Sequence, residues 1–454
     1  MKRRDVLRGA VGAAAALVAP AAWGQTRDTA PTPATAPTVT RQVLPNGVTL
    51  LVRENGAAGV VAATLHLVGG ASDDRREQAG ITNFLQRAML RGTTRRSAAE
   101  LLDAMADIGG TLETAADVDY AELRGAALAR HWERLLDLLA EVARAPALAP
   151  EEVERVRRLV ISEVHTRADN PSQFALDAML AELYGAHPYG LPPLGLAEAV
   201  ERISRDDLAA RYRTAYRPSA MVLAVSGRVP GAAVVRRASR LFGDLTTPDV
   251  GGGRSVPGTA RAGEPRTESV APRHQIERPG QQAQVLVGAV GPGIADADYA
   301  AVKVLSVLLG GGLGGRLFIE LREKRGLAYS VGVVNPSRRA GGYLIAHIGT
   351  EARNAPAAEA GLLRELERVR GEDVTEGELA RAKAYLLGTL AMDRRTNARE
   401  AWYLAFFEGA GVGWDFPERY ARAAEAVTID DVRRVAARYL ATPRTVVLLP
   451  LGHR

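Results

Sequence analysis

The feature that most constrains the fold is an internal repeat of a helix–turn–strand unit. Residues 203–227, "ISRDDLAARYRTAYRPSAMVLAVSG", align with residues 427–452, "VTIDDVRRVAARYLATPRTVVLLPLG". Each segment has the pattern of an Asp-capped helix, a turn that contains proline, and a Val/Leu-rich strand that ends at glycine. The apolar run at 282–292 likewise resembles the run at 59–70. We therefore expect two copies of one α+β unit.

A segment rich in glycine, proline, arginine and serine separates the two copies. Residues 246–281 have no apolar period, which is typical of a linker. A chain of 454 residues exceeds one ordinary core. We expect an N-terminal domain at 41–245 and a C-terminal domain at 282–454. The order of elements indicates an α+β fold, with helices covering one face of a mostly antiparallel or mixed sheet.

Apolar periodicity predicts the elements of the first copy. The expected elements are strands at 48–53 and 59–68, helices at 78–91 and 96–107, a strand pair at 111–128, and long helices at 130–145 and 149–184.

The N-terminus has the pattern of an export signal. Residues 1–24 combine a basic start with an apolar run too short to span a membrane, and cleavage is expected before Gln25. The pair Arg3-Arg4 indicates the twin-arginine route, and a general secretory signal is the alternative. Residues 25–40 are rich in proline, threonine and alanine and are expected to be a disordered spacer. The protein is predicted to be periplasmic or exported, without a later membrane anchor.

Composition excludes several classes of site and partner. The chain has no cysteine, which excludes disulfides, thiolate zinc sites and lipid attachment to cysteine. Part of the formal net charge of +6 lies in the leader, and basic residues do not cluster with aromatics. Nucleic-acid binding is therefore not expected.

The stretch 80–93, "GITNFLQRAMLRGT", predicts an amphipathic helix with three polar residues on one face. Asn83, Gln86 and Arg87 have the spacing i, i+3, i+4 with which a helix presents side chains to one point. Taken alone, the pattern is also that of an ordinary amphipathic helix.

The chain beyond the spacer resembles the pitrilysin/insulinase family of zinc metallopeptidases, in particular its smaller two-domain members that work as paired subunits. The frame around the family's inverted zinc motif, His-x-x-Glu-His, is kept at Gly80, Phe84, Leu85, Gly92 and Thr93. Asn83, Gln86 and Arg87 replace the motif's His, Glu and His. The third ligand of the family corresponds to Glu163, 76 residues after Arg87, and the segments 169–171 and 187–195 also resemble the family.

The substitutions predict a degenerate zinc site. Zinc requires neutral imidazoles or carboxylates, whereas an Asn83 amide is a poor ligand and Arg87 brings a permanent positive charge. Gln86 cannot accept a proton, so the base that activates water is absent as well. Glu163 cannot hold a metal alone and is free to pair with Arg87. The seven histidines have no i, i+3 or i+4 pairs, so we expect no metal in this chain.

The resemblance places a second set of functional residues in the C-terminal half. In "LREKRGLAYS", a helix over 316–325 is expected to end at Gly326 in a left-handed cap. Arg322 would bind a substrate carbonyl and Tyr329 would donate to the oxyanion that forms when water attacks. The alternative is a surface Arg322 paired with Glu320 or Glu323, and a Tyr329 partly packed in the core.

A glycine run lies just before this helix. Gly310, Gly311 and Gly312 form either a flexible lip that contacts extended peptide or a plain turn between helices. A phosphate loop is not indicated, because no Lys-Ser/Thr pair follows.

The resemblance implies a non-catalytic, substrate-binding subunit of a periplasmic zinc-dependent peptidase. Arg322 and Tyr329 would act in an active site whose zinc and His-x-x-Glu-His motif lie on a partner subunit, and this chain itself would need no cofactor. One alternative is a scaffold or peptide-binding protein without a proteolytic role. Another is an autonomous metallohydrolase with a displaced metal site.

Overall fold

The computed structural model describes residues 38–246, 273–371 and 374–452. The predicted export signal, most of the spacer and residues 247–272 of the predicted linker lie outside these ranges. Within them, no helix combines the length and apolar character needed to cross a membrane.

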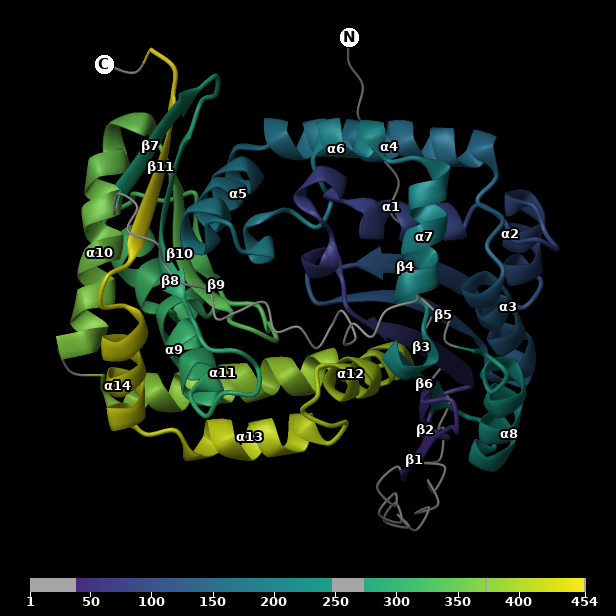
Figure 1. Cartoon of the computed structure of the whole chain (residues 1–454). Helices are drawn as coiled ribbons and strands as arrows, with labels where there is room; N and C mark the ends of the chain where they lie inside the picture. The colour runs from purple at the N-terminus through teal and green to yellow at the C-terminus, as the bar shows by residue number, and fades with distance from the viewer. Residues whose placement is uncertain (1–37, 247–272, 372–373, 453–454) are drawn as a thin grey trace, which may run out of the picture. The chain divides into compact units, whose positions relative to one another are not determined.

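The first half forms a six-stranded mixed sheet (Figure 1). Its strands are β1 (Val39–Val43), β2 (Thr49–Glu54), β3 (Val60–Val68), β4 (Thr111–Ala116), β5 (Tyr120–Leu128) and β6 (Met221–Gly227). They lie in the order β1-β2-β6-β3-β5-β4, and only the β2–β6 pair is parallel. Because β1 begins at Val39, the end of the predicted spacer is part of the sheet.

The second half forms a five-stranded mixed sheet. Its strands are β7 (Arg273–Arg278), β8 (Ala283–Val290), β9 (Ser330–Val334), β10 (Tyr343–Thr350) and β11 (Arg444–Pro450). They lie in the order β7-β11-β8-β10-β9, and only β7–β11 is parallel. The predicted α+β class with two similar mixed sheets is confirmed.

Strand β7 corrects the predicted linker 246–281, since six of the segment's residues belong to the second sheet. β7 is an edge strand that pairs with β11 alone, and most of its side chains are exposed. An exposed edge strand needs no apolar alternation, which is why no strand was predicted for these residues.

The repeated unit is present in both halves. α7 (Arg205–Ala215) leads into β6, and α14 (Ile429–Tyr439) leads into β11. Both helices begin with a capping box, in which the N-cap is Ser204 or Thr428 and the acidic residue lies three positions on. The expected Asp caps are therefore wrong. Asp207 and Asp431 lie at the third helical position and accept from the backbone N–H of the N-cap residue.

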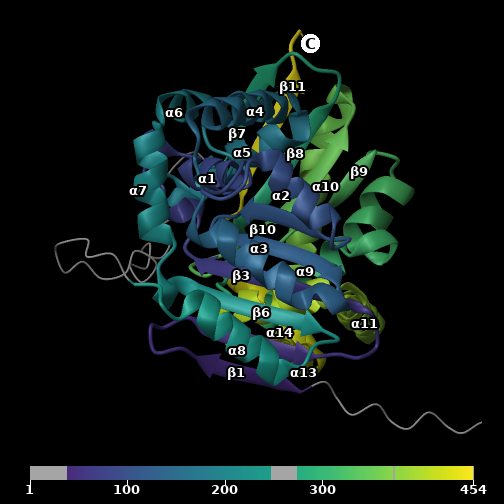
Figure 2. The ribbon, with the colours of Figure 1, turned by 90° about the vertical axis from the view of Figure 1, so that its right-hand side faces the viewer.

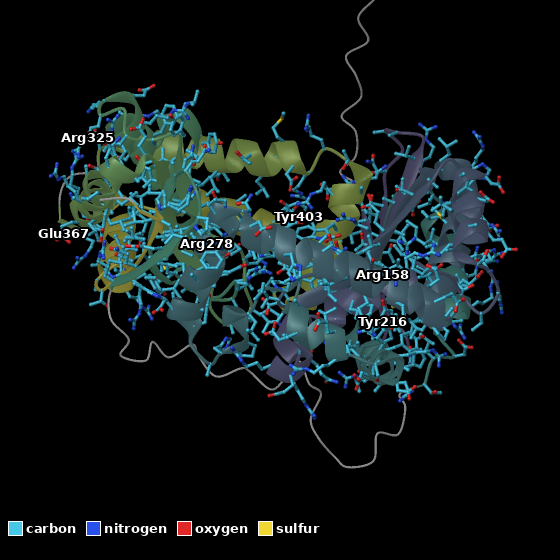
Figure 3. The ribbon with its side chains drawn as sticks, turned by 90° about the horizontal axis from the view of Figure 1, so that it is seen from above. Arg158, Tyr216, Arg278, Arg325, Glu367 and Tyr403 are labelled. Carbon is cyan, nitrogen blue, oxygen red and sulfur yellow. The ribbon has the colours of Figure 1, made fainter. Side chains whose placement is uncertain are left out.

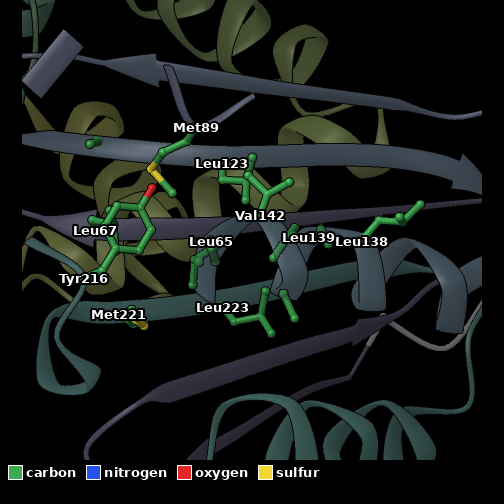
Figure 4. Close-up of a cluster of buried hydrophobic side chains, with 14 of the residues drawn as sticks. Leu65, Leu67, Met89, Leu123, Leu138, Leu139, Val142, Tyr216, Met221 and Leu223 are labelled. Atoms are coloured by element: carbon green, nitrogen blue, oxygen red, sulfur yellow. The ribbon is translucent and has the colours of Figure 1, made fainter. Parts of the chain in front are cut away.

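Helices of the first half cover one face of the first sheet. They are α1 (Ile81–Met89), α2 (Ala98–Ala106), α3 (Trp132–Arg144), α4 (Pro150–Asp169), α6 (Ala197–Arg202), α7 and α8 (Gly231–Phe242). Figure 4 shows Leu138 and Leu139 of α3 among the buried side chains that include Leu65, Leu123 and Leu223 of the strands. This apolar core holds the N-terminal helices, and with them α1, on the sheet.

The helix expected at 149–184 is broken into two. α4 ends at Asp169, and α5 (Pro171–Tyr184) begins after Asn170, whose φ is −79° and ψ 115°. A residue that precedes proline is driven out of the helical region. The Asn170 side chain then caps α5 by accepting from the backbone N–H groups of Ser172 and Gln173, at 3.0 and 3.1 Å.

The break at Asn170 permits an exchange of helices between the halves. α5 packs on the far face of the second sheet, where Met179 and Leu183 meet Ile345. In return, α12 (Asn397–Gly409) packs on the far face of the first sheet, where Leu404 meets Leu51. Figure 1 shows both helices beside the sheet of the other half, and Figure 2 shows α5 beside β8. The remaining helices of the second half are α9 (Tyr299–Gly310), α10 (Ala355–Gly371), α11 (Glu376–Asp393) and α13 (Phe416–Ala426).

Candidate functional site

Helix α1 is held in place by its own packing residues. Phe84, Leu85 and Met89 are fully buried. Gly80 precedes the helix with a φ of +97°, and a Cβ there would lie 2.7 Å from the Cα of Gly195. The frame residues that carry the family resemblance therefore fix the position of α1.

An acidic side chain secures the first turn of α1. The Asp74 carboxylate accepts from the backbone N–H groups of Gly80 and Thr82, each at 3.3 Å, and from the Thr82 hydroxyl. Burial raises the pKa of Asp74 to about 6, against the opposing effect of Arg211.

The side chains at positions 83, 87 and 163 converge, as the resemblance predicts. The two Nη atoms of Arg87 donate to the two oxygens of Glu163 on α4, each at 2.7 Å. Arg87 Nε also donates to Asn83 Oδ1, at 3.2 Å. The Arg87 and Glu163 side chains are 35% and 49% exposed, so this bidentate pair lies at the surface of a groove rather than in the core.

Gln86 points to a different partner. It is 1% exposed, its Nε2 donates to the hydroxyl of Tyr216 at 3.0 Å, and that hydroxyl lies 3.2 Å from Gln86 Oε1. Burial raises the pKa of Tyr216 well above its usual range. Tyr216 was not predicted as part of the site, because no motif links it to a residue 130 positions earlier.

These residues do not fit a zinc ion. Both oxygens of Glu163 and the amide oxygen of Asn83 already accept from Arg87, and the guanidinium would repel a dication. Gln86 offers no base. Across residues 38–246, 273–371 and 374–452, no group of three or more His, Asp or Glu side chains could hold a metal.

A groove of about 620 Å³ lies beside the Arg87–Glu163 pair. β4 forms one side, and it is the outer strand of the sheet, with β5 as its single strand partner in the described chain. Leu102 and Leu159 line the same groove and are 74% and 46% exposed. An open strand edge beside exposed apolar side chains can accept an extended peptide.

The segment that carries Arg322 and Tyr329 forms a π-helical turn. This turn spans Phe318–Glu323, and the chain leaves it through Gly326, whose φ is +62°. The left-handed glycine at the end of this helical segment is as predicted. The Gly326 N–H donates to the Arg322 carbonyl at 3.1 Å.

Both predicted substrate-binding side chains are accessible. Arg322 Nη1 donates to the Tyr329 carbonyl at 3.1 Å, and its guanidinium lies 5.1 Å from the Phe318 ring. Tyr329 is 64% exposed, so the alternative of a core tyrosine is wrong. Glu320 instead pairs with Lys324 at 2.7 Å, and Arg322 has no carboxylate partner in the described part of the chain.

The glycine run packs closely against its neighbours. Gly310 ends α9, and a Cβ on it would lie 2.5 Å from the backbone nitrogen of Val333 in β9. Gly311 has a similarly close contact with Val307, and Gly312 has a φ of +62° in a short 3-10 turn. The run thus forms a turn, and contact of Gly310, Gly311 or Gly312 with peptide stays a prediction. In the described residues, no hydrogen bond or ion pair joins Arg322 or Tyr329 to the α1 site.

Comparison with known proteins agrees with this geometry. The family model described as "Insulinase (Peptidase family M16)" matches residues 50–195, and the one described as "Peptidase M16 inactive domain" matches residues 202–386. An uncharacterized zinc protease of Mycobacterium tuberculosis is 31% identical over 428 residues, covering 93% of this chain and 95% of that protein. One of Streptomyces coelicolor is 28% identical, covering 91% and 90%.

Solved structures share the fold at lower identity. The peptidase M16 inactive domain from Pseudomonas fluorescens has a TM-score of 0.80 and 23% identity, covering 91% of this chain and 97% of its own. A protease from Helicobacter pylori has a TM-score of 0.82 and 20% identity, covering 91% and 100%. By its sequence and its fold, the chain belongs to the insulinase family, peptidase family M16, in which it is a peptidase-like member without the zinc motif.

Proposed function

We propose that this chain is the non-catalytic, peptide-binding subunit of a zinc-dependent peptidase that assembles from two related chains. The observation that carries the proposal is the Arg87–Glu163 pair. It fills the position of the metal ligands while the packing frame of α1 is intact. Because helix α1 keeps its position but lacks zinc ligands and a catalytic base, we infer a role in assembly and substrate binding.

The groove beside β4 supports peptide binding. An extended peptide could add to the open edge of β4, so that main-chain hydrogen bonds hold it in a sequence-tolerant way. Leu102 and Leu159 would cover its apolar side chains. In this role Arg87, held by Glu163, forms part of the groove wall.

Arg322 and Tyr329 would serve an active site completed by the partner. In this chain the Arg322 guanidinium is free of carboxylates and the Tyr329 side chain is exposed. Arg322 would orient a substrate carbonyl, and the Tyr329 hydroxyl would donate to the developing oxyanion. The partner would carry His-x-x-Glu-His and the zinc, and its glutamate would move the proton.

The site of action proposed is the periplasm. The support is the leader at 1–24, with its Arg3-Arg4 pair and a small-residue cleavage site before Gln25.

Co-purification with a family member that carries His-x-x-Glu-His, to be sought in the neighbouring reading frame, tests the proposal. We expect peptide cleavage by the pair, none by this chain alone, and a loss of about 100-fold in kcat for Tyr329→Phe with assembly unchanged. Arg322→Ala should also lose cleavage, and the exposed neighbour Arg325 (Figure 3) provides the matched control Arg325→Ala.

Two outcomes would contradict the proposal. Unchanged cleavage in both variants would favour a scaffold without a catalytic contribution. Stoichiometric zinc and cleavage in the isolated chain would favour an autonomous metallohydrolase.

A further inference from the structure

A second pocket, distant in sequence from α1, lies where α9, α12 and α13 meet β5. Its volume is about 720 Å³. The chain has 4 Trp, 12 Tyr and 7 Phe, and seven of these aromatic side chains line this one pocket. They are Tyr120, Tyr299, Trp402, Tyr403, Phe406, Phe407 and Tyr420. Such a concentration of flat side chains favours a ligand with a flat ring.

The rings form ordered walls. Trp402 stacks on Phe406 with centroids 4.7 Å apart and planes 8° apart. Tyr120 meets Phe406 edge-on at 5.6 Å. Tyr403, which Figure 3 labels, lies on the same helix as Trp402. Its hydroxyl donates a hydrogen bond of 2.8 Å to Asp393. The walls are therefore fixed before a ligand arrives.

Two cations in the pocket form no hydrogen bond or ion pair with a carboxylate of the described chain, although Arg395 also attracts Asp393 through space. Lys303 Nζ donates to the Asn335 carbonyl and lies 5.2 Å from the Tyr299 ring. Arg395, at the exposed rim, donates to the Met392 carbonyl. By contrast, the pocket's other two arginines are neutralised, Arg338 by Asp117 at 2.7 Å and Arg399 by Asp393 at 2.5 Å.

Lys303 is placed to respond to an anion. Burial, together with the smaller effect of the nearby Arg338 cation, lowers the pKa of Lys303 to about 7. A carboxylate beside it would offset both effects and favour the charged amine. Within the described residues, the Tyr120 and Tyr420 hydroxyls also have no hydrogen-bond partner, so the pocket offers further donors.

We propose that this pocket binds an aromatic carboxylate, with the ring between the aromatic walls and the carboxylate at Lys303. Arg395 at the rim attracts the anion. Two sources have this chemistry, a free aromatic acid and the C-terminal aromatic residue of a peptide. The proposal does not depend on the peptidase role, because neither α1 nor Arg322 and Tyr329 line the pocket.

Binding measurements on the full chain test this site. The probes are 3-phenylpropionate, its neutral amide, and a short peptide ending in phenylalanine as the free acid and as the C-terminal amide. We expect the dissociation constant of each acid to be lower than that of its amide by a factor of about ten or more. Lys303→Met should remove that preference, Arg395→Ala should weaken it, and the exposed Lys324→Met should leave it unchanged.

A second readout needs no variant. The chain has only four lysines, Lys2, Lys303, Lys324 and Lys383, so acylation at pH 7 can be mapped to each by peptide mass. The acid ligand should protect Lys303 and leave the other three unchanged. Binding of the small acid points to a free metabolite, and binding of the peptide acid alone points to a peptide terminus. Equal binding of acid and amide, or no binding at millimolar concentration, would overturn the proposal.

Discussion

The Arg87 guanidinium lies face to face with the Glu163 carboxylate, and two hydrogen bonds of 2.7 Å join them. The pair crosses from α1 to α4 and brings together the positions where the family's second and third zinc ligands would lie. Asn83 also reaches Arg87 from one helical turn away, so the three side chains meet at one point.

Restoring three side chains should therefore restore zinc binding. The triple variant Asn83→His, Gln86→Glu, Arg87→His is expected to hold about one zinc per chain after dialysis, measured by elemental analysis, whereas the wild type holds none. Adding Glu163→Gln should reduce the metal content. A triple variant that keeps its helical circular dichroism but binds no zinc would show that the backbone has also diverged.

The close approach of Gly80 to Gly195 predicts a large effect of one methyl group. Gly80→Ala must adopt a φ of +97° and place its Cβ 2.7 Å from a backbone carbon, so unfolding free energy should fall by roughly 2–4 kcal/mol in urea titrations. Gly326→Ala also has a positive φ, +62°, but no atom lies within 4 Å of its Cβ. It should cost only about 1–2 kcal/mol. Equal losses of unfolding free energy in the two variants would show that a Cβ at Gly80 does not clash with Gly195.

Glu122 on β5 predicts a pH dependence of stability. It is 1% exposed, accepts from Arg124 at 3.2 Å, and burial raises its pKa to about 7. Between pH 4.5 and 7 the unfolded chain loses this proton and the folded chain keeps it. The contribution to stability is therefore full at low pH and is lost as pH rises through 7.

Glu122→Gln should remove this loss. Urea titrations at pH 5 and pH 7.5 should show wild-type stability falling relative to the variant by up to roughly 3 kcal/mol. Glu323→Gln changes an exposed carboxylate and is the control. A variant whose stability follows the wild type at both pH values would show that Glu122 is ionised throughout.

The contact of Leu404 with the first sheet predicts that the halves stabilise each other. Leu404 on α12 is 4% exposed and packs with Leu51 and Val222. Leu404→Ala should cost about 2–5 kcal/mol in a single unfolding transition that involves both halves. Leu102→Ala removes a side chain that is 74% exposed and should change stability by less than about 0.5 kcal/mol. Two separate transitions in the Leu404 variant would contradict this coupling.

Local patterns predicted much of the fold. The apolar run at 59–68 and the alternation at 111–128 were sufficient to place β3, β4 and β5. The spacing of Asn83, Gln86 and Arg87 placed them on one helix. The pairing of Arg87 with Glu163 followed from the family resemblance and from charge. These features depend on neighbouring residues or on a motif, which a sequence displays directly.

Features that depend on distant contacts were missed. The Asn170-Pro171 step signals a helix break, but nothing local shows that α5 then crosses to the other sheet. Tyr216 has no recognisable link to Gln86, and the polar strand β7 owes its place to β11 rather than to its own pattern. The aromatic pocket likewise combines β5 with helices about 200 to 300 residues later, a proximity that only the tertiary structure creates.

The exchange of α5 and α12 also determines when, during translation, each sheet can be covered on its far face. When the ribosome has finished β6, the first sheet is complete, yet the face that receives α12 stays bare until residues 397–409 have been made. The sheet that receives α5 is likewise incomplete until the end of synthesis, because β8, β10 and β11 all follow α5 and β11 spans Arg444–Pro450. A nascent chain of this kind exposes apolar surface that can aggregate for most of its synthesis, and both sheets are covered only after its last strand has been made.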